Sequence, residues 1–180
     1  MTDTKLSARD ITHVGMFTAL TATGAFISIP FGPVPITLQS LFVLLSGIIL
    51  GSKKAMLSQV TYVLLGLMGL PVFAGFSGGL GQLLKPSAGF LFGFIAAAYC
   101  TGKFSGKNGT AKNLTLAVIT GTVVMYAIGI PYMYYVLNVM LAKNFSVMQI
   151  LNMGMFMFIP GDVIKAVIAV LVGKKLKENL

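Results

Sequence analysis

The basic residues of this chain separate its apolar stretches, and they gather on one side of the layer that those stretches define. Six apolar stretches alternate with short polar breaks. Lys85 and Lys143 would lie outside a membrane, and Lys165 falls within an apolar stretch. With the N-terminus inside, the other ten of the 13 basic residues are cytoplasmic: Lys5, Arg9, Lys53, Lys54, Lys103, Lys107, Lys112, Lys174, Lys175 and Lys177. This positive-inside bias predicts a membrane protein with both termini in the cytoplasm.

The composition agrees with a membrane protein and excludes other classes. Of the 180 residues, 56% are apolar and only 9% are charged, whereas soluble domains carry roughly 25% charged residues. The net charge of +9 does not indicate nucleic-acid binding, because the cations cap the apolar stretches and form no patch with interleaved aromatic residues. We expect a single membrane domain over residues 1–180.

The predicted fold is all-α, with six transmembrane helices. The expected spans are 12–29, 36–51, 55–70, 87–101, 114–132 and 153–173. Since about 20 helical residues cross the hydrocarbon core, several of these spans are short. Residues 133–152 are expected to form an amphipathic segment on the outer side.

Two irregular stretches on the outer side are rich in Gly and Pro and unusually apolar. They cover residues 30–35 and 72–86. Irregular backbone at membrane depth is tolerated only where it is buried in protein or lines a cavity. We therefore expect both loops to fold over a ligand pocket.

The segment Pro160-Gly161-Asp162-Val163-Ile164-Lys165 places two opposite charges inside the sixth span. Asp162 and Lys165 are three residues apart and share a helix face. Ionisable groups inside a membrane are costly and usually functional. One interpretation is a ligand site in which the carboxylate accepts from N–H groups. The alternative is an ion pair that only neutralises itself, although such a pair gains little over apolar packing.

Enzyme chemistry finds little support. Gly75-Phe76-Ser77-Gly78-Gly79 has the Gly-x-Ser-x-Gly spacing, but the one histidine, His13, lies at the opposite end of the first span. A catalytic serine needs a base within hydrogen-bond reach. The glycines are better explained by tight turns and close approach to a ligand. The chain has no phosphate-binding loop and too few ligands for a metal site, so we expect neither an enzyme nor a cofactor.

Small residues recur on the first span. Gly15, Ala19 and Thr23 are spaced by four, and Thr18 and Ala22 form an adjoining stripe. Such spacing lets helices approach closely. The stripe predicts either a packing face inside the protein or a docking face for another subunit.

Several motifs together resemble the BioY family, the biotin-binding S components of energy-coupling factor (ECF) transporters. They cover about residues 17–165 and comprise Val34-Pro35-Ile36-Thr37-Leu38-Gln39, Gly66-Leu67-Met68-Gly69-Leu70-Pro71-Val72-Phe73, Gly78-Gly79-Leu80-Gly81, residues 86–94, and residues 160–165. Lys85-Pro86-Ser87-Ala88-Gly89-Phe90 departs from the family's usual Gly-Pro-Thr-Gly-Gly-Tyr. Lys85 is therefore either an addition to the pocket rim or an exposed outer charge.

The resemblance implies a multi-pass protein of the prokaryotic plasma membrane that captures biotin and delivers it inward with a T component and two ATPases. The implied substrate site comprises Asp162, Lys165, Thr37, Gln39, Phe76, Gly79, Gln82 and Ser87. The implied docking face comprises Gly15, Thr18, Ala19 and Ala22. Thr37 has an alternative role as a helix cap. An S component for another vitamin, or a protease using Ser77, are the rival functions.

Overall fold

The computed structural model describes residues 6–106 and 109–178, and most of them are helical. The main helices are α1 (Ala8–Phe26), α2 (Gln39–Leu50), α3 (Ser52–Leu67), α4 (Ala88–Phe104), α5 (Ala111–Tyr134), α6 (Val147–Leu151) and α7 (Ile159–Glu178). A 3-10 turn, η1 (Leu80–Leu84), and two π-helical turns, η2 (Tyr135–Met140) and η3 (Asn152–Phe156), complete the helical structure. Two short antiparallel strands, β1 (Ser28–Ile29) and β2 (Ile36–Thr37), pair between α1 and α2.

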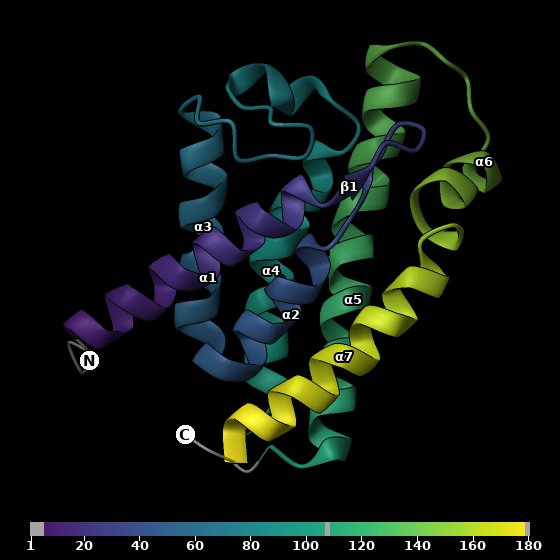
Figure 1. The fold of residues 1–180 in the computed structure, drawn as a ribbon. Coiled ribbons are helices and arrows are strands. Elements are labelled where there is room, and N and C mark those ends of the chain that lie inside the picture. Colours follow the sequence, from purple (N-terminus) through teal and green to yellow (C-terminus); the bar gives the residue numbers. More distant parts are fainter. Residues whose placement is uncertain (1–5, 107–108, 179–180) are drawn as a thin grey trace, which may run out of the picture.

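The helices form a bundle in which α1 and α7 are inclined to the others (Figure 1). Helices α3, α4 and α5 stand upright in this view, while α1 and α7 run diagonally across it. The β1–β2 hairpin and the loop that contains η1 lie toward the upper end. The loop that follows α3 and the hairpin that precedes α2 therefore meet at one end of the bundle.

Glycines allow α4 and α5 to pack closely. A Cβ atom at Gly89 would lie 2.3 Å from the Cβ of Tyr132, and one at Gly129 would lie 2.6 Å from the Phe90 ring. Side chains larger than hydrogen would separate the helices, which is the usual role of small residues in membrane bundles. This close packing brings Phe90 of α4 beside Tyr126 of α5, with their ring centroids 6.1 Å apart.

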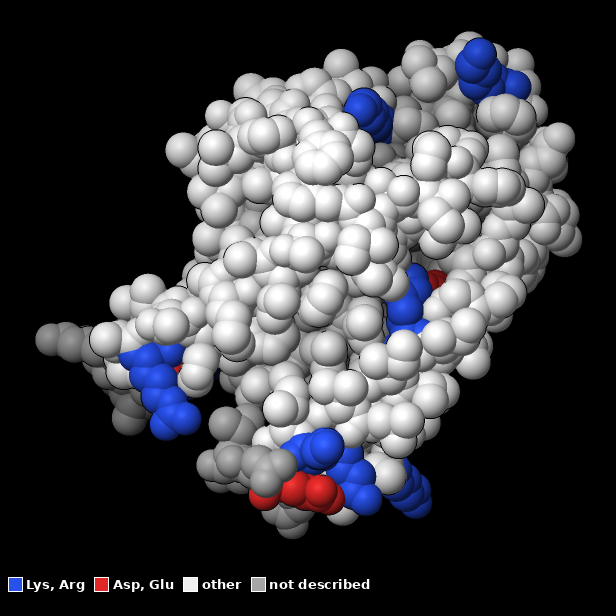
Figure 2. All heavy atoms as spheres, viewed as in Figure 1, with Lys and Arg blue, Asp and Glu red and all other residues white. Residues whose placement is uncertain are grey.

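The N-terminal end of α1 is fixed by polar contacts. Ser7 and Asp10 form a reciprocal capping box, and Lys54 of α3 forms an ion pair with Asp10. Hydrogen bonds from Lys54 and from the Ser7 backbone lower the pKa of the Asp10 carboxyl below its usual value. Figure 2 shows that basic side chains gather mainly at the lower end of the molecule, with few at the upper end. This distribution is the one that the sequence pattern predicts.

The surface of the bundle is apolar, as in a membrane protein. On α7, eight large aliphatic side chains are exposed, and Val163, Ile164, Val167 and Leu171 are the most exposed of them. Exposed apolar surface of this extent marks contact with lipid or with another protein. Two helical segments of the described residues, Ala111–Met140 and Val147–Glu178, are long and apolar enough to cross a membrane, and Gln39–Leu50 and Ala88–Phe104 are shorter apolar helices.

The six expected spans each contain a helix, but the count of membrane crossings stays a prediction. Helix α2 has 12 residues and is about 18 Å long, which is less than the hydrocarbon core of about 30 Å. Its expected start at residue 36 was wrong, because Ile36 and Thr37 form β2. The hairpin also makes the fold mostly helical rather than entirely so.

The segment expected to lie on the outer surface between the fifth and sixth spans has a different structure. Residues 133–140 extend α5 through the π-helical turn η2, and Val147 begins a continuous helical segment that runs to Glu178. Val136 and Leu137 are buried, so the apolar side of this extension packs on the bundle instead of lying alone at an interface.

Candidate functional site

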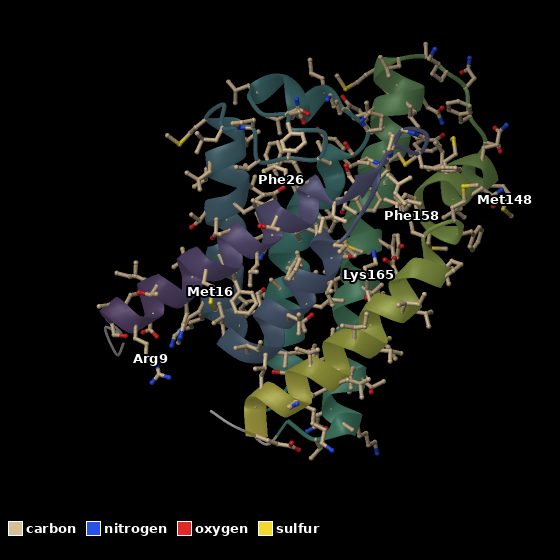
Figure 3. The ribbon with its side chains drawn as sticks, viewed as in Figure 1. Arg9, Met16, Phe26, Met148, Phe158 and Lys165 are labelled. Atoms are coloured by element: carbon tan, nitrogen blue, oxygen red, sulfur yellow. The ribbon has the colours of Figure 1, made fainter. Side chains whose placement is uncertain are left out.

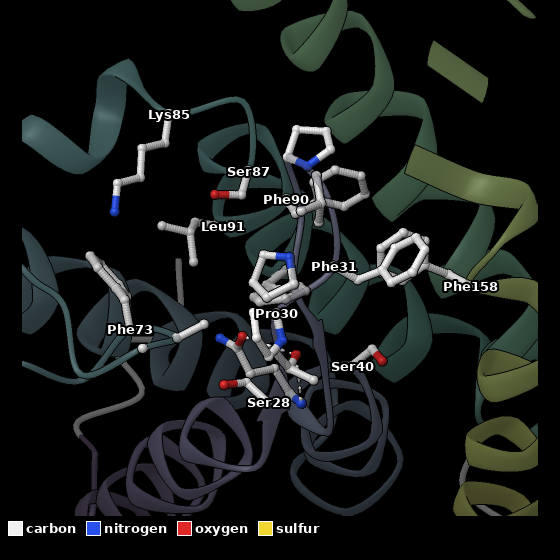
Figure 4. A pocket seen from close by; sticks show the side chains of 18 of the residues that line it. Ser28, Pro30, Phe31, Ser40, Phe73, Lys85, Ser87, Phe90, Leu91 and Phe158 are labelled. Atoms are coloured by element: carbon white, nitrogen blue, oxygen red, sulfur yellow. Dashed lines mark hydrogen bonds between the residues drawn. The ribbon is translucent and has the colours of Figure 1, made fainter. Parts of the chain in front are cut away.

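A cavity of about 330 Å³ lies where the β1–β2 hairpin meets the loop after α3 (Figure 4). Its walls come from five parts of the chain: residues 28–40, residues 73–87, and helices α4, α5 and α7. Aromatic side chains provide much of its apolar surface, namely Phe31, Phe73, Phe90, Phe94, Tyr126 and Phe158. Both Gly/Pro-rich loops therefore line one cavity, as the sequence predicts.

Asp162 and Lys165 both line this cavity, and they form an ion pair. The Lys165 ammonium lies 2.6 Å from Asp162 Oδ1, and the two side chains are 8% and 11% exposed, respectively. Asp162 lies in the first turn of α7, and its backbone N–H donates to the Phe158 carbonyl oxygen of the preceding turn (2.8 Å). Figure 3 places Lys165 in the interior of the bundle below Phe158. The charges are thus buried in protein and face a cavity rather than lipid.

The pair belongs to a larger polar network that joins three helices. Lys165 donates to Ser40 Oγ (2.8 Å) and to the Thr37 carbonyl oxygen (3.2 Å). The Tyr126 hydroxyl donates to Asp162 Oδ2. Ser40 and Tyr126 were not predicted from the sequence. One feature of the sequence could have suggested Tyr126, because it places a hydroxyl group inside an apolar span.

A second network connects the two loops through α2 and α3. Thr37 Oγ1 donates to Gln39 Oε1 (3.1 Å), and Gln39 Nε2 donates to the Tyr62 hydroxyl (2.7 Å). Tyr62 then donates to the Val72 carbonyl oxygen (3.0 Å). Thr37 and Gln39 line the cavity as predicted. Thr37 also accepts from the Gln39 backbone N–H (3.3 Å). The N-cap residue of α2 is nevertheless Leu38, with no side-chain cap hydrogen bond, so Thr37 faces the cavity without being the helix cap.

The loop after α3 contributes four further polar side chains to the cavity wall, namely Ser77, Gln82, Lys85 and Ser87. Gln82 accepts from Ser77 Oγ (3.3 Å) and donates to the Gly78 carbonyl oxygen (3.4 Å). Ser87 lines the cavity just before α4, and so does Lys85. Gln82 and Ser87 are therefore in the predicted place, and Lys85 lies at the rim.

Two residues expected in the site are not among those that line the cavity. Phe76 is 67% exposed and stacks on Phe26 of α1, with ring centroids 4.6 Å apart. Gly79 has a positive φ of 90°, and its backbone N–H donates to the Gly66 carbonyl oxygen (2.7 Å). Both residues shape the loop. The aromatic wall is instead supplied by Phe73, for which Gly66 leaves room, since a Cβ atom there would lie 2.0 Å from the ring.

Within the described residues, the Ser77 hydroxyl has no hydrogen bond to a His, Lys, Asp or Glu side chain. The Ser77 hydroxyl donates to the Ala74 carbonyl oxygen (2.8 Å), and His13 lines a different cavity at the base of α1. The geometry therefore does not support a serine protease. Among residues 6–106 and 109–178, no three His, Cys, Asp or Glu side chains lie together as a metal site.

The small-residue stripes of α1 have different surroundings. Gly15, Ala19 and Thr23 are exposed. Thr18 is buried and donates to the Ser58 carbonyl oxygen of α3 (2.9 Å), and Ala22 packs against the main apolar core. The adjoining stripe of Thr18 and Ala22 is thus an internal packing face, and only the stripe of Gly15 and Ala19 is free to meet another subunit.

Comparisons with known proteins agree with the motifs. The sequence model of the BioY family matches residues 1–180. The chain belongs to the BioY family. It is 42% identical to "Biotin transporter BioY" of Thermotoga maritima over 94% of this chain and 96% of that protein. It is 38% identical to "Probable biotin transporter BioY" of Pyrococcus horikoshii over 97% and 99%.

A solved structure also resembles this BioY-family chain. The 2.1 Å crystal structure of the S-component for biotin from an ECF-type ABC transporter is 28% identical, with a TM-score of 0.73 over 94% of this chain and 91% of that one. The similarity in both sequence and fold extends over nearly the whole chain.

Proposed function

We propose that this chain is a biotin-binding S component of an ECF transporter. The observation that carries the proposal is the buried pair of Asp162 and Lys165 at the wall of an apolar cavity, in a member of the BioY family. Biotin combines ureido N–H groups, a ureido carbonyl and a carboxylate with an apolar bicycle. The cavity offers a carboxylate, hydroxyl groups and aromatic walls, so its chemistry matches each part of that molecule.

The two loops would supply the burial that tight binding requires. Nanomolar affinity corresponds to about 12 kcal/mol, or about 0.8 kcal/mol for each of the roughly 16 heavy atoms of biotin. Such an efficiency requires nearly complete removal of the ligand from water. The hairpin and residues 73–87 both face the cavity, and the bonds from Gln39 through Tyr62 to Val72 link them. A ligand that contacts one loop would therefore also stabilise the position of the other loop through these hydrogen bonds.

The membrane arrangement follows from the charges. We infer six spans with both termini in the cytoplasm and the cavity on the outer side of a prokaryotic plasma membrane. The cavity end of the bundle carries few basic groups, while α7 ends with Lys174, Lys175 and Lys177. In this orientation biotin would enter from outside. We infer that a T component and two ATPases couple ATP hydrolysis to the movement of biotin, because the sequence has no phosphate-binding loop of its own.

Binding of radiolabelled biotin to the purified protein in detergent tests the proposal. We expect saturable binding with a nanomolar Kd that excess unlabelled biotin abolishes and excess thiamine or riboflavin does not. An S component for another vitamin is the second candidate, because the same cavity has hydrogen-bonding groups that suit several heterocycles. Absence of biotin binding by a folded sample, together with binding of another vitamin, would replace the proposal with that candidate.

A further inference from the structure

The charged residues around the cavity do not balance. Three of the lining residues are charged, namely Lys85, Asp162 and Lys165. Asp162 and Lys165 neutralise each other across 2.6 Å. Lys85 is left as one positive charge at the cavity. A cavity with a net charge of +1 favours a ligand that carries a single negative charge.

Lys165 is poorly suited to hold that negative charge. An ammonium group has three N–H donors. In Lys165 the three available partners are Asp162 Oδ1, Ser40 Oγ and the Thr37 carbonyl oxygen. A ligand carboxylate could reach Lys165 only by displacing one of them. It would also approach Asp162, whose like charge repels it.

Lys85 has neither restriction. Within residues 6–106 and 109–178, its ammonium makes no ion pair or hydrogen bond, and the neighbouring Ser87 hydroxyl makes none either. Lys85 lines the cavity, and Figure 4 shows its side chain extending down toward Phe73, to the left of Ser87 and Leu91. The backbone at Lys85 is extended (φ −85°, ψ 144°), which is the conformation that the following Pro86 favours.

We propose that Lys85 binds the carboxylate of the substrate at the mouth of the cavity and selects the free acid over its neutral derivatives. This inference rests on the proposed biotin binding and adds an orientation to it. The carboxylate would meet Lys85, with the Ser87 hydroxyl as a second donor. The uncharged ureido end would then face Asp162, Tyr126 and Ser40 in the interior. Lys85 is thus a specificity-determining residue, and Asp162, held in place by Lys165, recognises the opposite end of the ligand.

Two ligands and three proteins test this assignment. Biotin and biotinamide differ in the charge of one end only, and calorimetry gives the Kd of each for the wild type, Lys85→Met and Lys143→Met. The wild type should prefer biotin by roughly two- to fivefold, the upper part of the range for an ion pair at a solvent-accessible rim. In Lys85→Met, the Kd for biotin should rise by the same factor and the Kd for biotinamide should stay unchanged. The preference for biotin over biotinamide should therefore disappear. Lys143→Met, which removes another exposed lysine on an outer loop, should behave as the wild type does.

Each other outcome contradicts the inference in a different way. If Lys85→Met lowers the affinity for both ligands equally, Lys85 only supports the structure of the loop. If Lys85→Met keeps the preference for biotin, another group binds the carboxylate. The ionic strength provides a second readout, because raising salt from 50 to 500 mM should reduce the preference of the wild type and leave Lys85→Met unaffected. If the folded wild type binds neither ligand, the proposed function fails and this inference falls with it.

Discussion

The Lys165 ammonium lies 2.6 Å from Asp162 Oδ1, less than one helical turn along α7, and each partner has a further contact on another helix. Asp162 accepts from Tyr126 of α5, and Lys165 donates to Ser40 of α2. The pair therefore joins α7 to two neighbouring helices and faces the cavity at the same time. A structural role and a ligand-binding role must be separated by experiment.

Single substitutions of the pair should weaken biotin binding strongly. Asp162→Asn removes the carboxylate that neutralises Lys165. Lys165→Met removes the ammonium that neutralises Asp162. Lost charge-assisted hydrogen bonds are worth about 1.5–3 kcal/mol each, so we expect affinity to fall roughly ten- to a hundredfold in titration calorimetry. The thermal stability of both variants should fall as well, because an unpaired buried charge is costly.

The double variant Asp162→Asn/Lys165→Met separates the two roles. It removes both charges together, so its melting temperature should recover toward that of the wild type. If the pair contacts biotin, affinity should stay low in the recovered protein. Near-normal affinity of the folded double variant would instead assign the pair to structure alone.

Tyr126→Phe tests the hydroxyl that the sequence alone did not identify. The substitution leaves Asp162 Oδ2 without its donor while keeping the ring in the cavity wall. Loss of a hydrogen bond to a charged group costs about 1.5–3 kcal/mol when the group remains buried, and we expect a Kd for biotin at least about fivefold higher. Tyr134→Phe, at an exposed tyrosine in the last turn of the same helix, is the matched control. Equal Kd values for the two variants would show that the Tyr126 hydroxyl does not contribute to biotin binding.

Cysteine labelling tests the proposed topology. In a Cys100→Ala background, Lys143→Cys lies in the turn before α6 and Lys112→Cys in the first turn of α5, and both positions are exposed. A membrane-impermeant maleimide added to intact cells should label Lys143→Cys only, and permeabilisation should expose Lys112→Cys. The reverse labelling pattern would show that the protein has the opposite orientation in the membrane. Asn108, another position suited to the cytoplasmic test, lies outside the described residues.

The exposed stripe of α1 should serve assembly rather than substrate binding. A side chain at Gly15 would meet nothing within 4 Å inside the protein, so Gly15→Leu/Ala19→Leu should keep biotin affinity and stability. Co-purification with the T component and ATPases should fall several-fold. Normal assembly would show that this stripe faces lipid.

Thr18→Val is the matched control on the buried side of α1. It removes the hydrogen bond to the Ser58 carbonyl oxygen, so it should lower stability by about 1 kcal/mol without preventing assembly. Ala22, which packs against the core, is a less suitable position for a docking test, because a larger residue there would disturb internal packing.

Gly66→Ala should change the shape of the cavity by displacing the Phe73 ring that lines it. The new methyl group would lie 2.0 to 2.5 Å from three atoms of the Phe73 ring, so the ring must move. Overpacking costs about 1–3 kcal/mol, and displacement of Phe73 from the wall should raise the Kd for biotin. Gly15→Ala, with open space around the new methyl group, should change neither quantity. Unchanged binding by Gly66→Ala would mean that Phe73 does not contact the ligand.

The sequence by itself determined the class of protein and the charged pair that the structure places at the cavity wall. The low fraction of charged residues and the one-sided distribution of cations depend only on the order of residues along the chain. The pairing of Asp162 with Lys165 follows from the period of a single helix. The Gly/Pro-rich loops were equally visible, because apolar loops without a cavity to line would be unfavourable in a membrane.

Only the tertiary structure decided which groups complete the site and which faces are free. Tyr126 is 36 residues from Asp162, and Ser40 is 125 residues from Lys165. Helix periodicity predicts which residues share a face, but the partner of each face depends on how the helices pack. For the same reason the sequence could not separate exposed Ala19 from buried Thr18, nor predict that Phe76 would stack on Phe26 while Phe73 faced the cavity.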